Sequence, residues 1–172
     1  MRRTHLARAG RVVALAGGVG GAKLAWGLAH EVPDSALSLV VNTGDDLKAF
    51  GLRICPDLDT ITYTLAGLSN KASGWGIQGD TFRCLEALRR YGFTTWFRLG
   101  DEDLATHLYR TTLLNQGLSL TAVTARICNA LGVNSLVLPM TDGYAPTMVE
   151  TDVGKLHLQE YFVRERCQPK VK

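Results

Sequence analysis

Four aspartates, Asp45, Asp46, Asp57 and Asp59, fall within fifteen consecutive positions. We expect the first two just past the end of a strand and the other two at the start of a helix. Converging carboxylates suit Mg²⁺, a hard cation that prefers oxygen ligands and often bridges substrate phosphates. Turn aspartates plus a helix cap at Asp57 would give the same pattern. We favour the magnesium site because a glycine-rich segment is expected beside it.

That segment, Gly17-Gly18-Val19-Gly20-Gly21-Ala22-Lys23, lies where a strand should pass into a helix. Backbone N–H groups at such a junction can face an anionic phosphate. The segment is not a Walker A loop, because Ala22 precedes Lys23 and Leu24 replaces the magnesium-binding Ser or Thr. It also lacks the third glycine of the dinucleotide fingerprint. We interpret it as a phosphate-contacting loop, with a tight strand-helix turn as the alternative.

Further candidates lie on one expected helix and in one loop. Asp103 and His107 are one helical turn apart, so they share a face. His107 could be a metal ligand, a phosphate contact, an acid-base group or a structural hydrogen-bonding residue, and Asp101 could cap the helix. Trp75, between two glycines, could stack on a flat heterocycle or simply pack. No Ser-His-Asp or Cys-His constellation can be assembled, so covalent acyl chemistry is not indicated.

Hydrophobic runs and turn residues predict the elements that position these groups. A strand over 11–16, a loop over 17–21 and a helix over 22–30 open a βαβ unit, and the apolar run 37–42 supplies a parallel strand. In open α/β sheets, ligands bind past the carboxyl ends of such strands. The remaining prediction comprises helices over 58–66, 81–91, 101–116 and 119–131, a strand over 135–138 and a hairpin within 147–163.

The composition favours one α/β unit in the cytoplasm. The chain has 172 residues, 46% of them hydrophobic, and a net charge of only +3, which requires neither nucleic acid nor a membrane as partner. Its four cysteines form no C-x-x-C pair, so we interpret them as reduced thiols. Arg2-Arg3 resembles the start of a twin-arginine export signal, but the apolar run that follows is too short.

Several motifs, in this order and spacing, resemble the 2-phospho-L-lactate transferase family of coenzyme F-420 biosynthesis. They are Gly17-Gly18-Val19-Gly20-Gly21-Ala22-Lys23, Val41-Asn42-Thr43-Gly44-Asp45-Asp46, Cys55-Pro56-Asp57-Leu58-Asp59-Thr60, Gly74-Trp75-Gly76, Leu99-Gly100-Asp101, Asp103-Leu104-Ala105-Thr106-His107, Leu138-Pro139-Met140 and Gln159-Glu160-Tyr161-Phe162. The resemblance runs from Arg11 onward. It implies a Rossmann-like three-layer α/β sandwich with a mainly parallel sheet. It also implies that a ribityl hydroxyl of the deazaflavin FO attacks the phosphorus of a guanylyl-diphospho donor carrying lactate or enolpyruvate, releasing GMP.

The resemblance also assigns roles to individual residues. Asp45 and Asp59 are similar to the family's magnesium and deazaflavin-side carboxylates, so they are the predicted metal ligands and catalytic groups. The donor phosphates are expected at Gly17, Gly18, Gly20, Gly21 and Lys23. Other expected substrate contacts are Asn42, Asp46, Asp57, Trp75, Arg98, Asp101 and His107. Phosphoryl-type transfer requires mainly positioning and charge neutralisation, which this set supplies.

The sequence departs from the family pattern at two places. Glu102 stands where an arginine is usual, and the family's later glycine-serine-asparagine-proline segment is absent. We therefore expect a basic extension over residues 1–10 and, over residues 11–172, the truncated N-terminal part of one transferase domain. A second copy of the chain, in a homodimer, is among the expected partners. The alternatives are a non-catalytic nucleotide-sugar-binding regulator of the gluconeogenesis-factor type and an inactive truncated homologue. Two motifs favour the transferase over the regulator, namely Asp57-Leu58-Asp59-Thr60 and Gly74-Trp75-Gly76.

Overall fold

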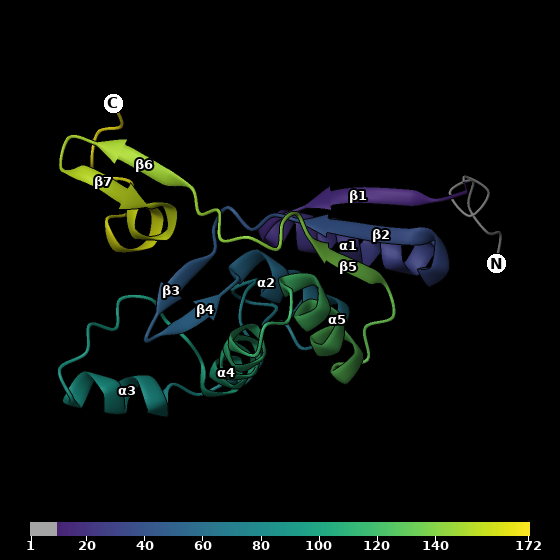
Figure 1. The fold of residues 1–172 in the computed structure, drawn as a ribbon, viewed down its shortest axis with the longest axis horizontal. Helices are drawn as coiled ribbons and strands as arrows, with labels where there is room; N and C mark the ends of the chain where they lie inside the picture. The colour runs from purple at the N-terminus through teal and green to yellow at the C-terminus, as the bar shows by residue number, and fades with distance from the viewer. Residues whose placement is uncertain (1–9) are drawn as a thin grey trace.

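The computed structural model describes residues 10–172 and is built on a three-stranded parallel sheet. Strands β1 (Val12–Ala16), β2 (Leu37–Val41) and β5 (Leu136–Pro139) lie in the order β1-β2-β5. Their arrowheads point the same way in Figure 1, toward the part of the molecule that holds the candidate site. The predicted α/β class with a parallel sheet is confirmed. Of the expected N-terminal extension, residues 1–9 lie outside the described residues.

Three helices cover one face of this sheet. Helices α1 (Gly18–Glu31), α2 (Pro56–Leu65) and α5 (Leu120–Ala130) pack on the sheet through alternate side chains of β2, namely Leu37, Leu39 and Val41. These three side chains are at most 1% exposed. Burial of such aliphatic side chains contributes about 1.5–3 kcal/mol each, which makes this layer the main core.

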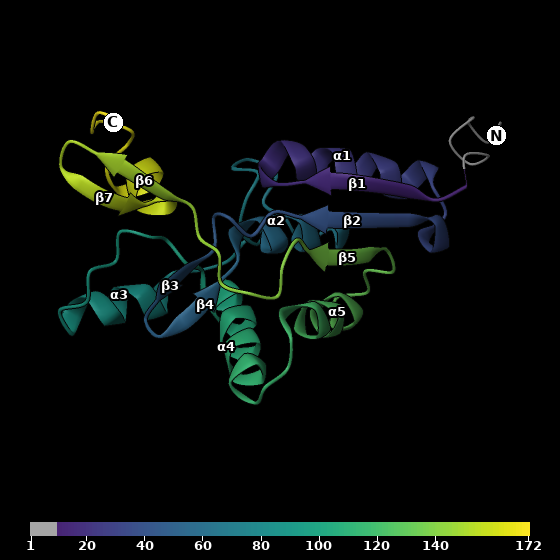
Figure 2. The same cartoon turned by 45° about the horizontal axis from the view of Figure 1, so that its top comes forward.

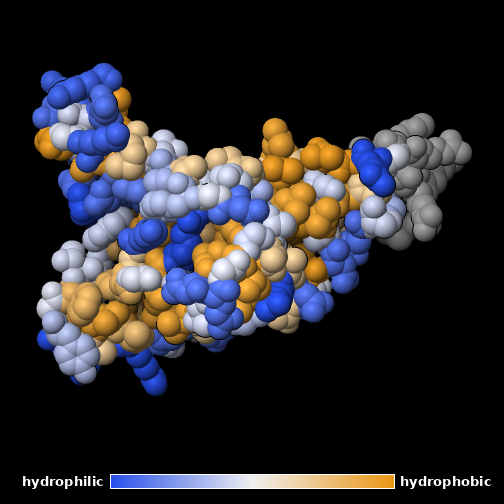
Figure 3. Space-filling view, in the orientation of Figure 1, coloured by the Kyte–Doolittle hydropathy of each residue, from blue (hydrophilic) through white to orange (hydrophobic). Residues whose placement is uncertain are grey.

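The opposite face of the sheet carries exposed apolar side chains. Val13 is 64% exposed and Leu15 79% exposed, and Leu136 of β5 is also exposed. Figure 3, drawn in the orientation of Figure 1, shows apolar side chains gathered over this part of the molecule. A parallel sheet normally has both faces covered. Within residues 10–172, the helices of the main core cover only the other face.

The short helix η2 (Asp34–Ala36) directly precedes β2, at its amino end. The other elements extend from the carboxyl ends of the strands, as Figure 2 shows. They are hairpin β3 (Leu47–Ala49) and β4 (Leu52–Ile54), helices α3 (Arg83–Arg90) and α4 (Asp101–Asn115), hairpin β6 (Met148–Thr151) and β7 (Gly154–His157), and the turn η3 (Glu160–Arg164). Hairpin β3-β4, α4 and the loop before α4 share a second apolar cluster, formed by Leu47, Ile54, Leu99 and Leu104. The hairpin predicted within 147–163 is present.

Two local features differ from the prediction. The segment expected as a loop over 17–21 is mostly the first turn of α1, because the Gly21 N–H already donates to the Gly17 carbonyl at 3.2 Å. Hairpin β3-β4 was not predicted. Its turn residues Phe50 and Gly51 both have positive φ, 54° and 76°, and such a turn is usually indicated by Asn-Gly or Asp-Gly rather than by a phenylalanine.

No helix among the described residues has the length and apolar character needed to cross a membrane.

Candidate functional site

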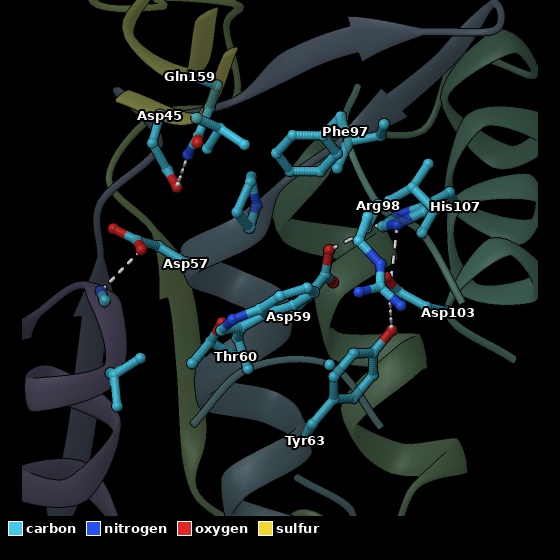
Figure 4. Close-up of a pocket in the computed structure, with 18 of the residues that line it drawn as sticks. Asp45, Asp57, Asp59, Thr60, Tyr63, Phe97, Arg98, Asp103, His107 and Gln159 are labelled. Atoms are coloured by element: carbon cyan, nitrogen blue, oxygen red, sulfur yellow. Dashed lines mark hydrogen bonds and ion pairs between the residues drawn. The ribbon is translucent and has the colours of Figure 1, made fainter. Parts of the chain in front are cut away.

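A cavity of about 550 Å³ lies beyond the carboxyl ends of β1 and β2. Figure 4 shows aspartates, an arginine and aromatic side chains converging on it from different elements. Its lining comprises Gly18, Val19, Asp45, Ile54, Pro56, Asp57, Asp59, Thr60, Tyr63, Trp75, Gly76, Trp96, Phe97, Arg98, Leu99, Asp103, His107, Gln159, Val163 and Arg166. This volume and mixture of apolar and polar groups are typical of a small-molecule site.

Asp57 connects three elements at the rim of the cavity. Its Oδ1 accepts a hydrogen bond of 2.7 Å from the Gly18 N–H at the start of α1. Its Oδ2 accepts one of 2.9 Å from the Asn42 amide just after β2. Asp57 itself is in the first turn of α2, whose N-cap is Cys55. The carboxylate therefore joins α1, β2 and α2, and its role differs from the helix cap considered as an alternative.

The close approach of Asp57 explains a glycine. A Cβ atom at Gly17 would lie 2.6 Å from Asp57 Oδ2 and 3.1 Å from Asn42 Cβ. Both distances are shorter than ordinary van der Waals contact, so a larger residue would displace the carboxylate. The junction between β1 and α1 therefore requires a glycine at position 17.

Asp45 is buried at the cavity wall with only one of its oxygens satisfied. Gln159 donates to Oδ2 at 3.2 Å, whereas Oδ1 has no hydrogen-bond partner. Burial raises the pKa of Asp45 to about 8, and the negative charges of Asp57 and Asp46 contribute to the rise. Neighbouring carboxylates that raise one another's charge density form a place where a cation would be stabilised. The residues present therefore fit a divalent cation.

Asp46 does not line the cavity and is neutralised by an arginine of the adjacent hairpin. Arg53 donates to Asp46 Oδ2 through Nε at 2.9 Å and through Nη2 at 2.6 Å, and the Cys55 thiol donates to the same oxygen at 3.1 Å. Burial raises the pKa of Asp46, and these hydrogen bonds counteract the rise. Asp46 therefore holds β4 against the strand end rather than contributing to the cavity wall.

Asp59 lies at the cavity floor and pairs with a buried arginine of α4. Both terminal nitrogens of Arg110 donate to its carboxylate, and Nη1 also lies 3.0 Å from His107 Nδ1. On the other side of the imidazole, His107 Nε2 is 3.3 Å from Asp103 Oδ1. The Tyr63 hydroxyl donates to this Asp103 oxygen at 2.8 Å. The five side chains form one continuous buried polar network.

The charges of this network reinforce one another. Burial alone would raise the pKa of Asp103, but its contact with His107, the hydrogen bond from Tyr63 and the positive charge of Arg110 lower it. Burial would lower the pKa of Arg110, but the Asp59 carboxylate raises it. Arg110 and Asp103 are therefore ionised at neutral pH. Donor atoms of Asp59, Asp103 and His107 also lie within 4.8 Å of one another, so this group could hold a metal ion.

Aromatic side chains form a second part of the cavity lining. Trp75, Trp96 and Phe97 line the cavity, and Trp75 is 45% exposed in its glycine-flanked loop. Arg98 lies beside them, with its guanidinium 4.2 Å from the centre of the Phe82 ring. An extended apolar wall with one cation at its edge can accept a planar heterocycle that carries polar substituents.

The structure brings together only part of the predicted set. Gly18, Asp45, Asp57, Asp59, Trp75, Arg98 and His107 line the cavity. Gly17 and Asn42 lie just behind it, where Asn42 holds Asp57. Those absent from the lining are Gly20, Gly21, Lys23, Asp46 and Asp101. Lys23 is exposed on α1, and Asp101 accepts hydrogen bonds from the backbone of α3.

Sequence reasoning missed Arg110, Tyr63 and Gln159. Arg110 could have been found, because it follows His107 by three positions on the same helical face as Asp103. Tyr63 lies one turn beyond Asp59 on α2 and could have been found in the same way. Gln159 reaches Asp45 from 114 residues away along the chain, and no local pattern predicts such a contact.

Comparison with known proteins identifies the family to which this chain belongs. Residues 12–172 match the family described as 2-phospho-L-lactate transferase CofD. The chain belongs to this family. It is 45% identical over 162 residues to a phosphoenolpyruvate transferase of Streptomyces avermitilis, covering 91% of this chain and 51% of the relative. It is 41% identical over 152 residues to a 2-phospho-L-lactate transferase of Methanospirillum hungatei, covering 88% of this chain and 51% of the relative. The chain thus spans about half the length of these CofD-family relatives.

A solved structure supports the fold. A crystal structure of a UPF0052 family protein from Bacillus halodurans matches with a TM-score of 0.53 and 16% identity. The match covers 95% of this chain and 49% of that protein. This similarity concerns the fold alone, and it agrees with the parallel-sheet architecture of the CofD-family chain.

Proposed function

We propose that this CofD-family chain provides the cation, phosphate and acceptor contacts of a transferase that joins a phosphorus-linked group to FO. In the proposed reaction, an FO ribityl hydroxyl attacks the donor phosphorus that carries lactate or enolpyruvate. A new P–O bond forms, the P–O bond to GMP breaks, and the hydroxyl proton is released. The two named relatives include one transferase of each donor type, so both donors remain in the proposal.

The cavity supplies groups suited to both reactants. The Gly18 N–H at the start of α1 and the exposed cation of Arg98 are suited to the donor's phosphates. The wall of Trp75, Trp96 and Phe97 is suited to the planar deazaflavin. Neither surface contains an activated nucleophile, which agrees with a direct transfer between two bound substrates.

The observation that carries the proposal is the unpartnered Oδ1 of buried Asp45, beside Asp57. A bound Mg²⁺ would neutralise charge on the transferring phosphoryl group. The sequence predicted Asp45 and Asp59 as its ligands. Asp45 with its neighbour Asp57 supports a cation at this wall, and Asp59 provides a third carboxylate at the cavity floor. The remaining side chains orient the substrates and exclude water.

A binding and turnover experiment tests the proposal. FO fluorescence should be quenched saturably by the purified chain, with Mg²⁺ and GDP present, and riboflavin should compete poorly. Product formation from FO, Mg²⁺ and the activated donor is then followed chromatographically, with the Methanospirillum hungatei relative as a positive control. A saturable response to a UDP-sugar with no response to FO would overturn the proposal in favour of a nucleotide-sugar-binding regulator.

A further inference from the structure

The cavity contains two groups of carboxylates that differ in whether a cation already accompanies them. At the cavity wall, Asp45 makes no ion pair with any described lysine or arginine, and its Oδ1 is unpartnered. At the floor, Asp59 has both oxygens bonded to Arg110. A free divalent cation therefore meets a carboxylate without a cationic partner at the wall and a carboxylate already paired with an arginine at the floor.

The floor group has the composition of a metal site. Its ligand atoms come from Asp59, Asp103 and His107, all at most 8% exposed, and lie within 4.8 Å of one another. Two carboxylates and an imidazole are a common ligand set for first-row divalent metals. The i,i+4 spacing of Asp103 and His107 on α4 places two of these ligands on one helical face.

The guanidinium of Arg110 is bonded directly into this ligand set. Nη1 lies 3.1 Å from Asp59 Oδ2 and 3.0 Å from His107 Nδ1, so it occupies one potential ligand atom of each of these two residues. Because a guanidinium only donates, His107 Nδ1 accepts, and its proton is on Nε2, toward Asp103. A metal at the same donor atoms would have to displace a buried arginine, which would leave a charge without a partner at a cost of several kcal/mol.

We infer that Arg110 is the resident cation of the Asp59–Asp103–His107 group and excludes divalent metals from it, so that the divalent cation binds at Asp45. The inference rests on the proposed function for the cation, and it assigns Arg110 the role of a residue that determines site selectivity. Arg110 thereby keeps Asp59 ionised and fixed at the floor without a second metal ion. It acts through Asp59 and His107, so it is a positioning residue.

This role predicts that removing the charge of Arg110 increases, rather than decreases, the affinity of the protein for a divalent metal. Mn²⁺ binding is measured by calorimetry on wild type, Arg110→Met, Arg110→Lys and Leu113→Ala. Leu113 is a buried residue of the same helix that does not line the cavity, so its variant controls for general destabilisation. Arg110→Met should bind Mn²⁺ at least tenfold more tightly than wild type or show a second site, because a positive charge is removed and three ligands are released. Arg110→Lys and Leu113→Ala should bind like wild type.

The identity of the new ligands gives a second readout. Adding His107→Gln to Arg110→Met should abolish the gain, whereas His107→Gln alone should leave wild-type Mn²⁺ affinity unchanged. Asp45→Asn alone should weaken it. An Arg110→Met protein that binds Mn²⁺ no more tightly than wild type would overturn the inference. Failure of wild type to bind Mn²⁺ at all would instead count against the cation of the proposed function.

A measurement on wild type covers the case in which Arg110→Met does not fold. The NMR signals of the buried Arg110 guanidinium, assigned through Arg110→Lys, should persist unchanged in frequency at saturating Mg²⁺. Their loss or a shift to the frequency of a solvent-exposed arginine would show that the cation displaces Arg110, and this would overturn the inference.

Discussion

Asp80 and Asp101 exchange their capping roles: Asp80, which precedes α3, caps α4, and Asp101, the first residue of α4, caps α3. The Asp80 carboxylate accepts from the Glu102 and Asp103 N–H groups at the start of α4, at 3.0 and 3.1 Å. The Asp101 carboxylate accepts from the Arg83 and Cys84 N–H groups at the start of α3, at 3.1 and 3.0 Å, and from the Thr81 hydroxyl. This exchange holds the loop that contains Arg98 in place beside the cavity.

The exchanged caps should be energetically coupled. Asp80→Ala and Asp101→Ala should each lower the free energy of unfolding by about 0.5–2 kcal/mol, as loss of a helix cap does. The double variant should lose less than the sum, because each substitution already loosens the other helix. Urea unfolding of the four proteins measures this cycle, with Asp142→Ala, which removes a hydrogen bond to Thr121 N at the start of α5, as a control. If the losses of unfolding free energy in Asp80→Ala and Asp101→Ala add up to the loss in the double variant, the two caps are not coupled.

The buried carboxyl of Asp45 should make the metal-free protein less stable as pH rises. Its pKa is about 8 in the folded chain and 3.8 ordinarily, so between these values the folded state binds more protons than the unfolded state. Stability from this group therefore falls from about pH 4 to about pH 8, by at most about 1.4 kcal/mol per pH unit. Asp45→Asn should flatten this part of the profile in chelator-treated protein. An identical profile in both proteins would contradict the assignment.

The ion pair of Arg53 and Asp46 should respond asymmetrically to substitution. Arg53→Met leaves a fully buried carboxylate without its cation and should cost about 3–5 kcal/mol. Asp46→Asn should cost less, because Arg53 also donates to the Gly143 carbonyl and can reach solvent. Thermal and urea unfolding provide the measurement. Equal losses in both variants would show that the burial of Asp46 does not control the effect.

Gly17→Ala should damage the junction of β1 and α1. Its Cβ would lie 2.6 Å from Asp57 Oδ2, so the carboxylate must move away from the Gly18 N–H. We expect weaker binding of Mg²⁺ with GDP in calorimetry, by about tenfold, while the circular dichroism spectrum is retained. Gly20→Ala, where a Cβ meets nothing within 4 Å, is the matched control. Equal affinities in the two variants would refute the role given to this close approach.

The exposed sheet face should promote self-association. Leu15 is 79% exposed on β1, and an apolar face of this kind is a site of association. Leu15→Lys should shift sedimentation at high protein concentration toward the monomer, whereas Leu24→Lys, on exposed α1, should not. If wild type and Leu15→Lys sediment identically as monomers, this face does not drive association.

The parallel sheet and most helices could be predicted because their residues carry the information locally. Apolar runs specify β1 and β2, and Ser119 accepts from the Ala122 N–H at 3.1 Å, as expected of the cap of α5. The partners of the aspartates could not be predicted in this way. Asp57 is bonded to Gly18, 39 positions away, and Asp59 to Arg110, 51 positions away. Their roles depend on how separate elements pack.

The bond between Asp57 and the Gly18 N–H also has a kinetic consequence. The amide that is suited to a donor phosphate is already occupied by a carboxylate at 2.7 Å, and an approaching nucleotide would also be repelled by the charge of Asp57. A cation that first binds beside Asp45 would draw the Asp57 charge toward itself and release that amide. We therefore expect an ordered mechanism, in which the divalent ion enters before the nucleotide and the association rate of GDP rises with the occupancy of the cation site.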